Sequence, residues 1–210
     1  FTGQMSLAQA AFFGLGAYVL GLGTTSWGLS WWQAFGAATT ISAAAGLLLG
    51  ITTLRLGGHY LAMVTISFGI IFSLILFSAS GLTKGPDGVS GIPRATVFGL
   101  SLESQAAFAI FSLLFLYAAI AGIYWLRDTT LGRAMRAVRD DELAADVVGV
   151  NTFGAKVISF VLGAVLGGIG GALFATGYSF IGPEDFTFLQ STEMITMVVI
   201  GGTGYVLGGV

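Results

Sequence analysis

The sequence has 210 residues, of which 55% are hydrophobic and only 9% charged, and its formal net charge is −2. Soluble domains carry about 25% charged residues, and a charge at the centre of a membrane helix costs about 2.5–3.5 kcal/mol, so the composition excludes an ordinary soluble domain and predicts an all-α, polytopic transmembrane helical bundle. The absence of cysteine excludes disulfides and thiolate metal sites, and the lack of a basic excess argues against nucleic acid as a partner.

Apolar runs of about 20 residues, the length that crosses the hydrocarbon core, predict the transmembrane helices. Five such segments occur, at residues 4–22, 32–54, 60–80, 106–126 and 157–178. A sixth begins near Thr192 and either spans the membrane or re-enters it, because its glycines would weaken a free helix. We therefore expect about six spans in a single transmembrane domain over residues 1–210, truncated at both ends.

The basic residues of the predicted loops indicate which side faces the cytoplasm. Six of them fall in one set of alternating loops: Arg55, Arg127, Arg133, Arg136, Arg139 and Lys156. The other set holds only Lys84 and Arg94. By the positive-inside rule, loops 55–59 and 127–156 are expected to be cytoplasmic. The loops expected outside are 23–31, 81–104 and 179–191. Tryptophans prefer the membrane boundaries, and we expect Trp27, Trp31 and Trp32 at the outer one and Trp125 at the inner one.

Glycine repeats predict how the spans pack. Gly163, Gly167 and Gly171 recur every four residues on one face of the fifth predicted span. Small residues at this spacing let helix backbones approach closely in lipid. This face either packs tightly against another helix and no more, or it also lines a pathway or a dimer seam.

The stretch 127–156 holds ten of the chain's eighteen charged residues. Its residue types predict two short helices, the first capped by Thr129 or Thr130, the second over 142–148 capped by Asp140 or Asp141 and ended by Gly149 or Asn151. The second helix offers an apolar face of Leu143, Val147 and Val148, flanked by charge. The stretch is either a solvated loop or a docking element. Five acids balance its five bases, which favours docking, because acids contribute little to a topology signal.

A few polar residues lie within or beside the predicted spans. Gln4, Ser6 and Gln9 lie in the first, and Thr192 and Glu193 begin the sixth. These five residues are candidates for a substrate path, where they could hydrogen-bond a passing zwitterion. Glu193 has a second interpretation, in which it simply marks the boundary of the sixth span with outer water, because a buried carboxylate is costly unless it is paired or protonated.

Residues 3–18, GQMSLAQAAFFGLGAY, resemble the first signature of the Liv-type permeases, the membrane subunits of bacterial ABC importers for branched-chain amino acids. Four later segments are similar in the same order, at 82–93, 132–142, 144–151 and 198–204. The resemblance covers nearly the whole chain, and it is closer to the LivM branch than to the LivH branch.

The resemblance implies a multi-pass subunit of the bacterial inner membrane that works with a second, homologous permease, two cytoplasmic ATPases and an extracytoplasmic substrate-binding protein. It also implies that hairpin 127–156 holds the coupling helix that docks into an ATPase. The residues carried over to this role are Arg133, Arg136, Glu142, Ala144, Ala145 and Gly149. ABC permeases often mark the helix with Glu-Ala-Ala, three residues and Gly; here Leu143 stands where the acid should be.

The sequence contains no Walker A motif, so we expect a transporter subunit and not an enzyme, with no catalytic or metal site and no cofactor of its own, the ATP being bound by partner subunits. The expected function is translocation of branched-chain or related amino acids. The alternative is an ion-coupled secondary transporter of a small polar solute. That class uses intramembrane charged residues, for which only Glu193 is a candidate.

Overall fold

The computed structural model describes residues 7–54, 59–97, 100–102 and 104–202. The longest elements are helices α1 (Gln9–Thr25), α2 (Trp31–Thr53), α3 (His59–Ser78), α5 (Gln105–Asp128), α8 (Thr152–Tyr178) and α9 (Phe188–Gly201). Of these, α2, α3, α5 and α8 are long and apolar enough to cross a membrane. The two shorter ones are α1, with 17 residues, and α9, with 14. Each of the six expected spans therefore corresponds to a helix, and four have spanning length within the described residues.

Three helix starts differ from the sequence prediction. Helix α1 begins at Gln9, and residues 4–6 of its predicted span lie outside the described part of the chain. Helix α8 begins five residues earlier than expected, because the Asn151 side chain caps it by accepting a hydrogen bond from the Gly154 amide at 2.8 Å. Helix α9 begins at Phe188, before the predicted Thr192.

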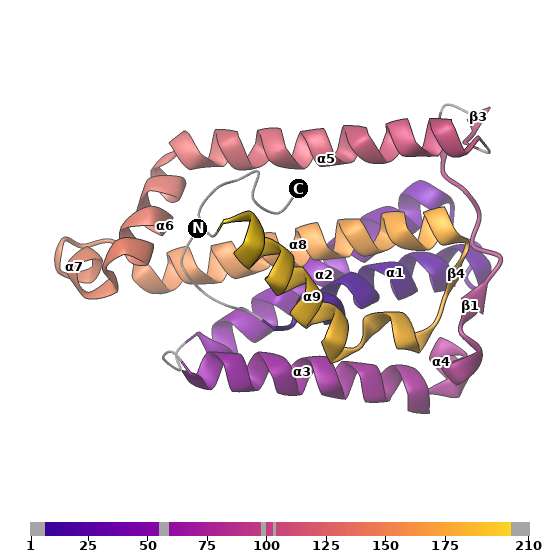
Figure 1. Cartoon of the computed structure of the whole chain (residues 1–210), viewed down its shortest axis with the longest axis horizontal. Coiled ribbons are helices and arrows are strands. Elements are labelled where there is room, and N and C mark those ends of the chain that lie inside the picture. The colour runs from indigo at the N-terminus through magenta and orange to yellow at the C-terminus, as the bar shows by residue number, and fades with distance from the viewer. Residues whose placement is uncertain (1–6, 55–58, 98–99, 103, 203–210) are drawn as a thin grey trace.

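Helices α1, α2 and α8 pack against one another at the centre of the bundle (Figure 1). The close approach of α1 to α8 depends on glycine. A Cβ atom added at Gly16 would clash with the Gly168 carbonyl, and one added at Gly171 would clash with the Phe13 carbonyl. No large apolar side chain could stand between these backbones, as is typical of small-residue contacts between membrane helices.

The remaining long helices surround this three-helix core. Helices α3 and α9 contact α1, while α5 lies along the opposite edge of the molecule and has no buried residue among those described (Figure 1). Helix α5 contacts α2 through aromatic rings: Phe111 packs edge-on against Trp31 at a centroid distance of 5.7 Å, and Phe115 packs against Phe35 at 5.2 Å. Its outward apolar surface is what a lipid-facing helix presents.

The short elements gather at the two ends of the long helices. One end holds α6 (Thr130–Asp140) and α7 (Glu142–Val147). The other end holds α4 (Ser80–Thr83), η1 (Gly85–Asp87), β1 (Val89–Ser90), β2 (Thr96–Val97), β3 (Leu100–Ser101), β4 (Phe180–Ile181) and η2 (Pro183–Phe186). Strand β1 pairs antiparallel with β4, Val89 opposite Ile181, and β2 pairs with β3, Thr96 opposite Ser101.

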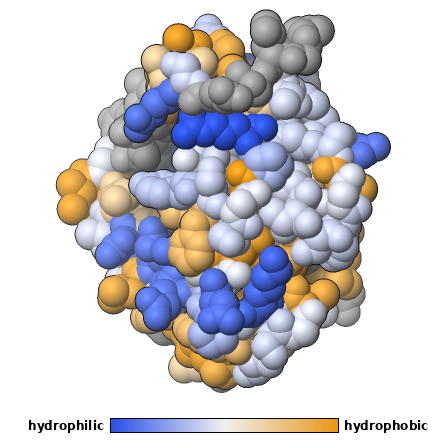
Figure 2. Space-filling model, turned by 90° about the vertical axis from the view of Figure 1, so that its right-hand side faces the viewer, coloured by the Kyte–Doolittle hydropathy of each residue, from blue (hydrophilic) through white to orange (hydrophobic). Residues whose placement is uncertain are grey.

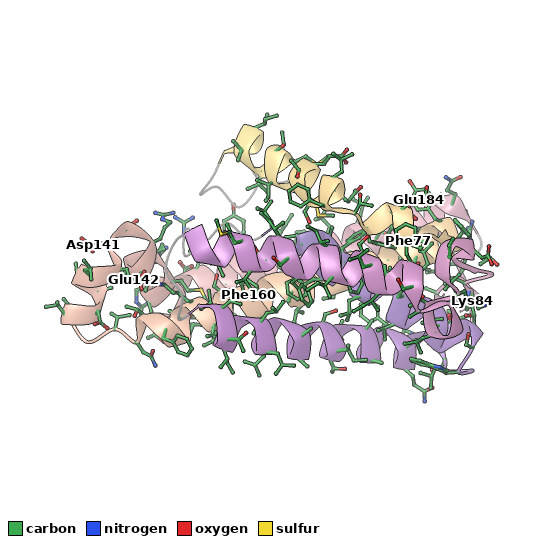
Figure 3. The ribbon with its side chains drawn as sticks, turned by 90° about the horizontal axis from the view of Figure 1, so that it is seen from below. Phe77, Lys84, Asp141, Glu142, Phe160 and Glu184 are labelled. Carbon is green, nitrogen blue, oxygen red and sulfur yellow. The ribbon has the colours of Figure 1, made fainter. Side chains whose placement is uncertain are left out.

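Charge follows the same division. Asp141 and Glu142 lie at the α6–α7 end, and Lys84 and Glu184 at the strand end (Figure 3). On the strand end, hydrophilic side chains alternate with apolar ones (Figure 2). The described part of 81–104 lies at the end opposite to 127–156, as the prediction requires (Figure 1). The segment 179–191 starts at that end but then runs back along α1, where Phe186 packs at Gly14 and Ser191 bonds to Ala10.

Trp31 lies at the start of α2, as expected for a boundary residue, but its side chain points into the bundle and not outward. Trp31 is buried, and its indole Nε1 donates a hydrogen bond to the Thr176 hydroxyl at 3.0 Å. Trp27, Trp32 and Trp125 are exposed. The helix register explains the difference, because Trp31 is the first residue of α2 and turns inward against α8, whereas its neighbour Trp32 turns outward.

Candidate functional site

The hairpin between α5 and α8 is built from two capped helices. The Thr129 hydroxyl accepts a hydrogen bond from the Gly132 amide at 3.2 Å and caps α6. The Asp141 carboxylate accepts one from the Ala144 amide at 3.0 Å and caps α7. Helix α7 ends where Gly149 adopts a φ of +86°, in the left-handed region that favours glycine. The structure thus selects Thr129, Asp141 and Gly149 from the predicted alternatives.

Helix α6 is amphipathic. Its Met135 and Val138 are buried with Ala145 and Ala155 in a small apolar cluster that joins α6, α7 and α8. The Arg133 side chain is exposed and donates to the Asp128 carbonyl at 2.7 Å, and Arg136 is half-buried. The hairpin therefore has its own core and is not an unstructured loop.

Helix α7 turns large aliphatic side chains outward. Leu143, Val147 and Val148 are 80%, 88% and 82% exposed, while Ala145 is 5% exposed. Ala145, one of the residues carried over to the coupling role, packs its side chain inside the hairpin cluster. Ala144 is exposed. We name the three exposed side chains Leu143, Val147 and Val148 the α7 apolar face.

An ion pair ties α7 to α8. The Lys156 ammonium contacts the Glu142 carboxylate, and the Lys156 side chain is largely buried while that of Glu142 is half-exposed. Lys156 therefore belongs to the first turns of α8 and not to a loop, as the predicted hairpin boundary had placed it. The pair and the cluster around Ala145 are two separate links from α7 to α8.

Helix α8 in turn contacts α1 through the predicted glycine face. A Cβ atom at Gly167 would lie 3.2 Å from Phe12 Cβ, and one at Gly163 would lie 3.2 Å from Gln9 Nε2. Gln9 was expected on a substrate path, and the structure places its amide against the α8 glycines. Gln4 and Ser6 lie outside the described residues.

The other predicted path residues lie on α9. Thr192 and Glu193 are exposed, and neither is among the residues that line the cleft described below. The buried neighbour Ser191 accepts a hydrogen bond from the Ala10 amide at 3.0 Å, which joins the start of α9 to the start of α1.

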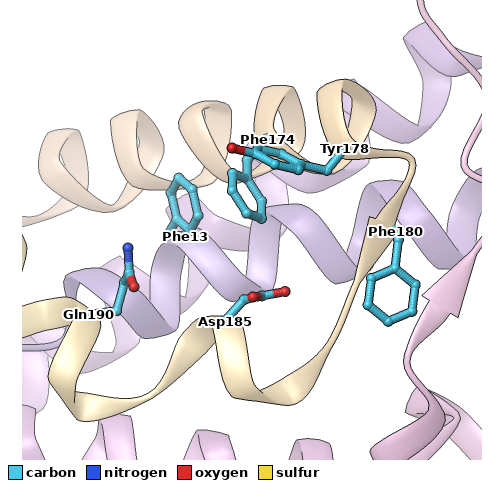
Figure 4. A pocket seen from close by; sticks show the side chains of 6 residues that line it. All are labelled: Phe13, Phe174, Tyr178, Phe180, Asp185 and Gln190. Carbon is cyan, nitrogen blue, oxygen red and sulfur yellow. The ribbon is translucent and has the colours of Figure 1, made fainter.

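A cleft of about 530 Å³ lies where α1 and α8 face the η2–α9 segment (Figure 4). Its lining residues are Phe13, Phe174, Tyr178, Phe180, Asp185 and Gln190. The Asp185 carboxylate accepts a hydrogen bond from the Gly182 amide at 3.0 Å. Sequence analysis missed Asp185, because Gly182 and Pro183 indicate only a turn and nothing in the chain order predicts that Phe13 lies nearby.

No group of three or more His, Asp or Glu side chains is arranged to hold a metal ion in the part of the chain that the structure describes. The two candidate sites are therefore the α7 apolar face and the cleft, which lie toward opposite ends of the bundle.

Comparison with known proteins adds the family. A family model described as the permease component of the branched-chain amino acid transport system matches residues 1–210. The high-affinity branched-chain amino acid transport system permease protein LivM of Salmonella typhimurium is 35% identical over 226 residues, which cover 97% of this chain and 53% of that protein. LivM of Escherichia coli gives the same values.

A weaker match links the chain to the partner branch. The permease protein LivH of Escherichia coli is 32% identical over 111 residues, covering 53% of this chain and 35% of that protein. The chain spans about half the length of the LivM proteins that it matches. No solved structure matches it.

Proposed function

The chain belongs to the permease family of the branched-chain amino acid transport system, and we propose that it forms the translocating core of one permease subunit of an ABC importer for branched-chain or related amino acids. It is a multi-pass membrane protein. Its proposed location is the bacterial inner membrane, with the α6–α7 end in the cytoplasm, as the excess of arginine at that end supports.

The proposed partners follow from what the chain lacks and from its relatives. Its sequence has no Walker A motif, so ATP would be hydrolysed on two separate ATPase subunits. The similarity to both LivM and LivH supports a second permease subunit beside this one. An extracytoplasmic binding protein would deliver the amino acid at the strand end.

The observation that carries the proposal is the α7 apolar face. Three large aliphatic side chains are almost fully exposed on α7 and its C-cap residue Val148. The same short segment carries Glu142 and Asp146, charges that the membrane interior does not favour. Burying one such side chain is worth about 1.5–3 kcal/mol. A short amphipathic helix of this kind fits a groove of another protein, which here is an ATPase subunit.

The packing supplies a route for movement. Displacement of α7 by a closing ATPase pair would reach α8 through the Ala145 cluster and the Glu142–Lys156 ion pair. Helix α8 would then move α1, because the glycine contacts leave no side chain to absorb the displacement. Rocking of α1 and α8 against the outer helices would open the path alternately to the two sides.

The ion-coupled alternative depends on Glu193, which is exposed on α9 and is not among the residues that line the cleft. The described structure therefore gives this alternative no support.

A cysteine cross-link tests the proposal directly, because the chain has no cysteine of its own. In the assembled transporter, Val147→Cys carrying a photoactivated maleimide should cross-link to an ATPase subunit. The matched control is Leu82→Cys, also exposed but on α4 at the opposite end; it should give no such product. ATPase cross-links from Leu82→Cys, or none from Val147→Cys in a transporter that takes up substrate, would refute the docking role.

A further inference from the structure

We propose that the cleft between α1, α8 and the η2–α9 segment is a binding site for the transported amino acid, taking its ammonium group beside Asp185 and its apolar side chain against the aromatic wall. This inference rests on the proposed function and names a site for its substrate. The site combines three features that an amino acid with an apolar side chain requires: a negative charge, an apolar surface and a hydrogen-bond donor.

The negative charge comes from Asp185. Its carboxylate is fixed by the Gly182 amide, 3.0 Å from one of its oxygens, and it points toward the side of the cleft formed by α1 and α8 (Figure 4). None of the six lining residues is basic. A carboxylate without a basic neighbour in its own cleft, half-buried among aromatic rings, attracts a cation more strongly than it would in bulk water.

The apolar surface is aromatic. Phe174 lies 5.3 Å from Phe13 and 4.6 Å from Tyr178, measured between ring centroids, so three rings from α1 and α8 form one wall. Aromatic faces attract ammonium groups by about 0.5–2 kcal/mol, and they also accept a branched aliphatic side chain. The same wall therefore suits both parts of the ligand.

The donor is Gln190, on the opposite side of the cleft from Phe13 (Figure 4). Its amide has two N–H donors that can meet the carboxylate of a zwitterion. The volume of about 530 Å³ falls within the range of about 300–1,000 Å³ that is usual for small-molecule sites. With one charge and one amide, the site would bind weakly, as a transient station on a transport path must.

One lipid carries the same chemistry, because the headgroup of phosphatidylethanolamine also presents an ammonium group. The two ligands can be separated, since only the lipid can be removed from the membrane. We assign the site to the free amino acid, because the cleft of about 530 Å³ brings the charge, the donor and the apolar wall together at the scale of a small molecule.

The experiment measures equilibrium binding of labelled leucine to the permease–ATPase complex without binding protein, in vesicles of phosphatidylglycerol. Asp185→Asn keeps an oxygen for the Gly182 amide but removes the charge, and it should weaken leucine binding about tenfold. Tyr178→Leu, at an exposed position that the core does not need, should weaken it about threefold. The matched control is Glu184→Gln, which removes the charge of the exposed acid immediately before Asp185. This variant should bind leucine as the wild type does.

Two further arms decide between the remaining outcomes. The oxo acid 4-methyl-2-oxopentanoate has no ammonium group, so Asp185→Asn should not weaken its binding. The proposal is overturned if this variant loses affinity equally for leucine and the oxo acid, or if it loses no affinity for leucine. If added phosphatidylethanolamine competes with leucine in the wild type but not in Asp185→Asn, the site belongs to the headgroup.

ATP-driven uptake by the wild type is measured in parallel. If the wild type takes up no amino acid, the proposed function is refuted. If the wild type transports but Asp185→Asn binds leucine as tightly as the wild type does, only the cleft proposal is refuted.

Discussion

The ammonium group of Lys156, in α8, pairs with the carboxylate of Glu142, the first residue of α7, across a separation of 14 residues. This pair and the Ala145 cluster are the links through which a force on α7 reaches the bundle. Because the Lys156 side chain is largely buried and that of Glu142 is half-exposed, uptake and stability are measured on the same variants so that the two roles of the pair can be separated.

Reversing either charge of this pair should reduce uptake, and reversing both should restore it. Glu142→Lys or Lys156→Glu alone places like charges together and loosens α7 from α8, while the double variant recreates the pair with opposite polarity. Uptake in vesicles is the measurement, and thermal unfolding of each variant separates a loss of coupling from a loss of stability. The matched control is Asp140→Asn, which breaks the Arg139–Asp140 pair within α6 and should leave uptake unchanged. A double variant as impaired as the single variants would contradict the role of the pair.

The glycines of α8 should differ in their tolerance of alanine. Gly171→Ala brings a Cβ atom against the Phe13 backbone carbonyl, which cannot move away without shifting α1. We expect a loss of about 1–3 kcal/mol in the free energy of unfolding. Gly163→Ala should cost less, because its added atom meets only the end of the flexible Gln9 side chain at 3.2 Å.

Gly122→Ala, on α5, provides the control for these substitutions. No atom lies within 4 Å of a Cβ atom added there, and alanine favours a helix by about 0.8–1.0 kcal/mol over glycine. Thermal unfolding of the purified protein should therefore rank Gly171→Ala as the least stable variant and Gly122→Ala as the most stable. A reversed order would mean that α8 does not contact α1 through this face.

Trp31→Phe should destabilise the bundle by about 0.6–1.7 kcal/mol, the range for a hydrogen bond between membrane helices. The substitution removes the donor to Thr176 but keeps a ring to stack on Phe35, whose centroid lies 5.0 Å away. Trp27→Phe, at an exposed site, is the control. Equal unfolding temperatures for the two variants would show that the buried hydrogen bond contributes nothing.

Much of this fold could be predicted from the sequence, because membrane helices are set by local composition. The boundaries of α2, α3 and α5 fall within two residues of the apolar runs that predicted them. The caps at Thr129 and Asp141 and the left-handed turn at Gly149 follow from side-chain and backbone chemistry within a few residues.

What escaped prediction depends on contacts between distant segments. The inward turn of Ala145 requires a cluster contributed by three helices, and the burial of Trp31 requires Thr176 on α8. The cleft forms only because the pairing of β1 with β4 and the fold of η2 bring Asp185 opposite Phe13. No periodicity along the chain encodes these juxtapositions.

The most direct test of the account is the amount of amino acid transported per ATP hydrolysed when the α7 apolar face is made polar. Val147→Asp changes a side chain that is 88% exposed and contacts nothing that folding requires, so insertion into the membrane should be normal. We predict that uptake is lost while the ATPase subunits bind less or hydrolyse ATP without transport. The control Leu82→Asp, at the opposite end, should transport normally. Wild-type uptake per ATP by Val147→Asp would contradict the claim that this face receives the force of ATP hydrolysis.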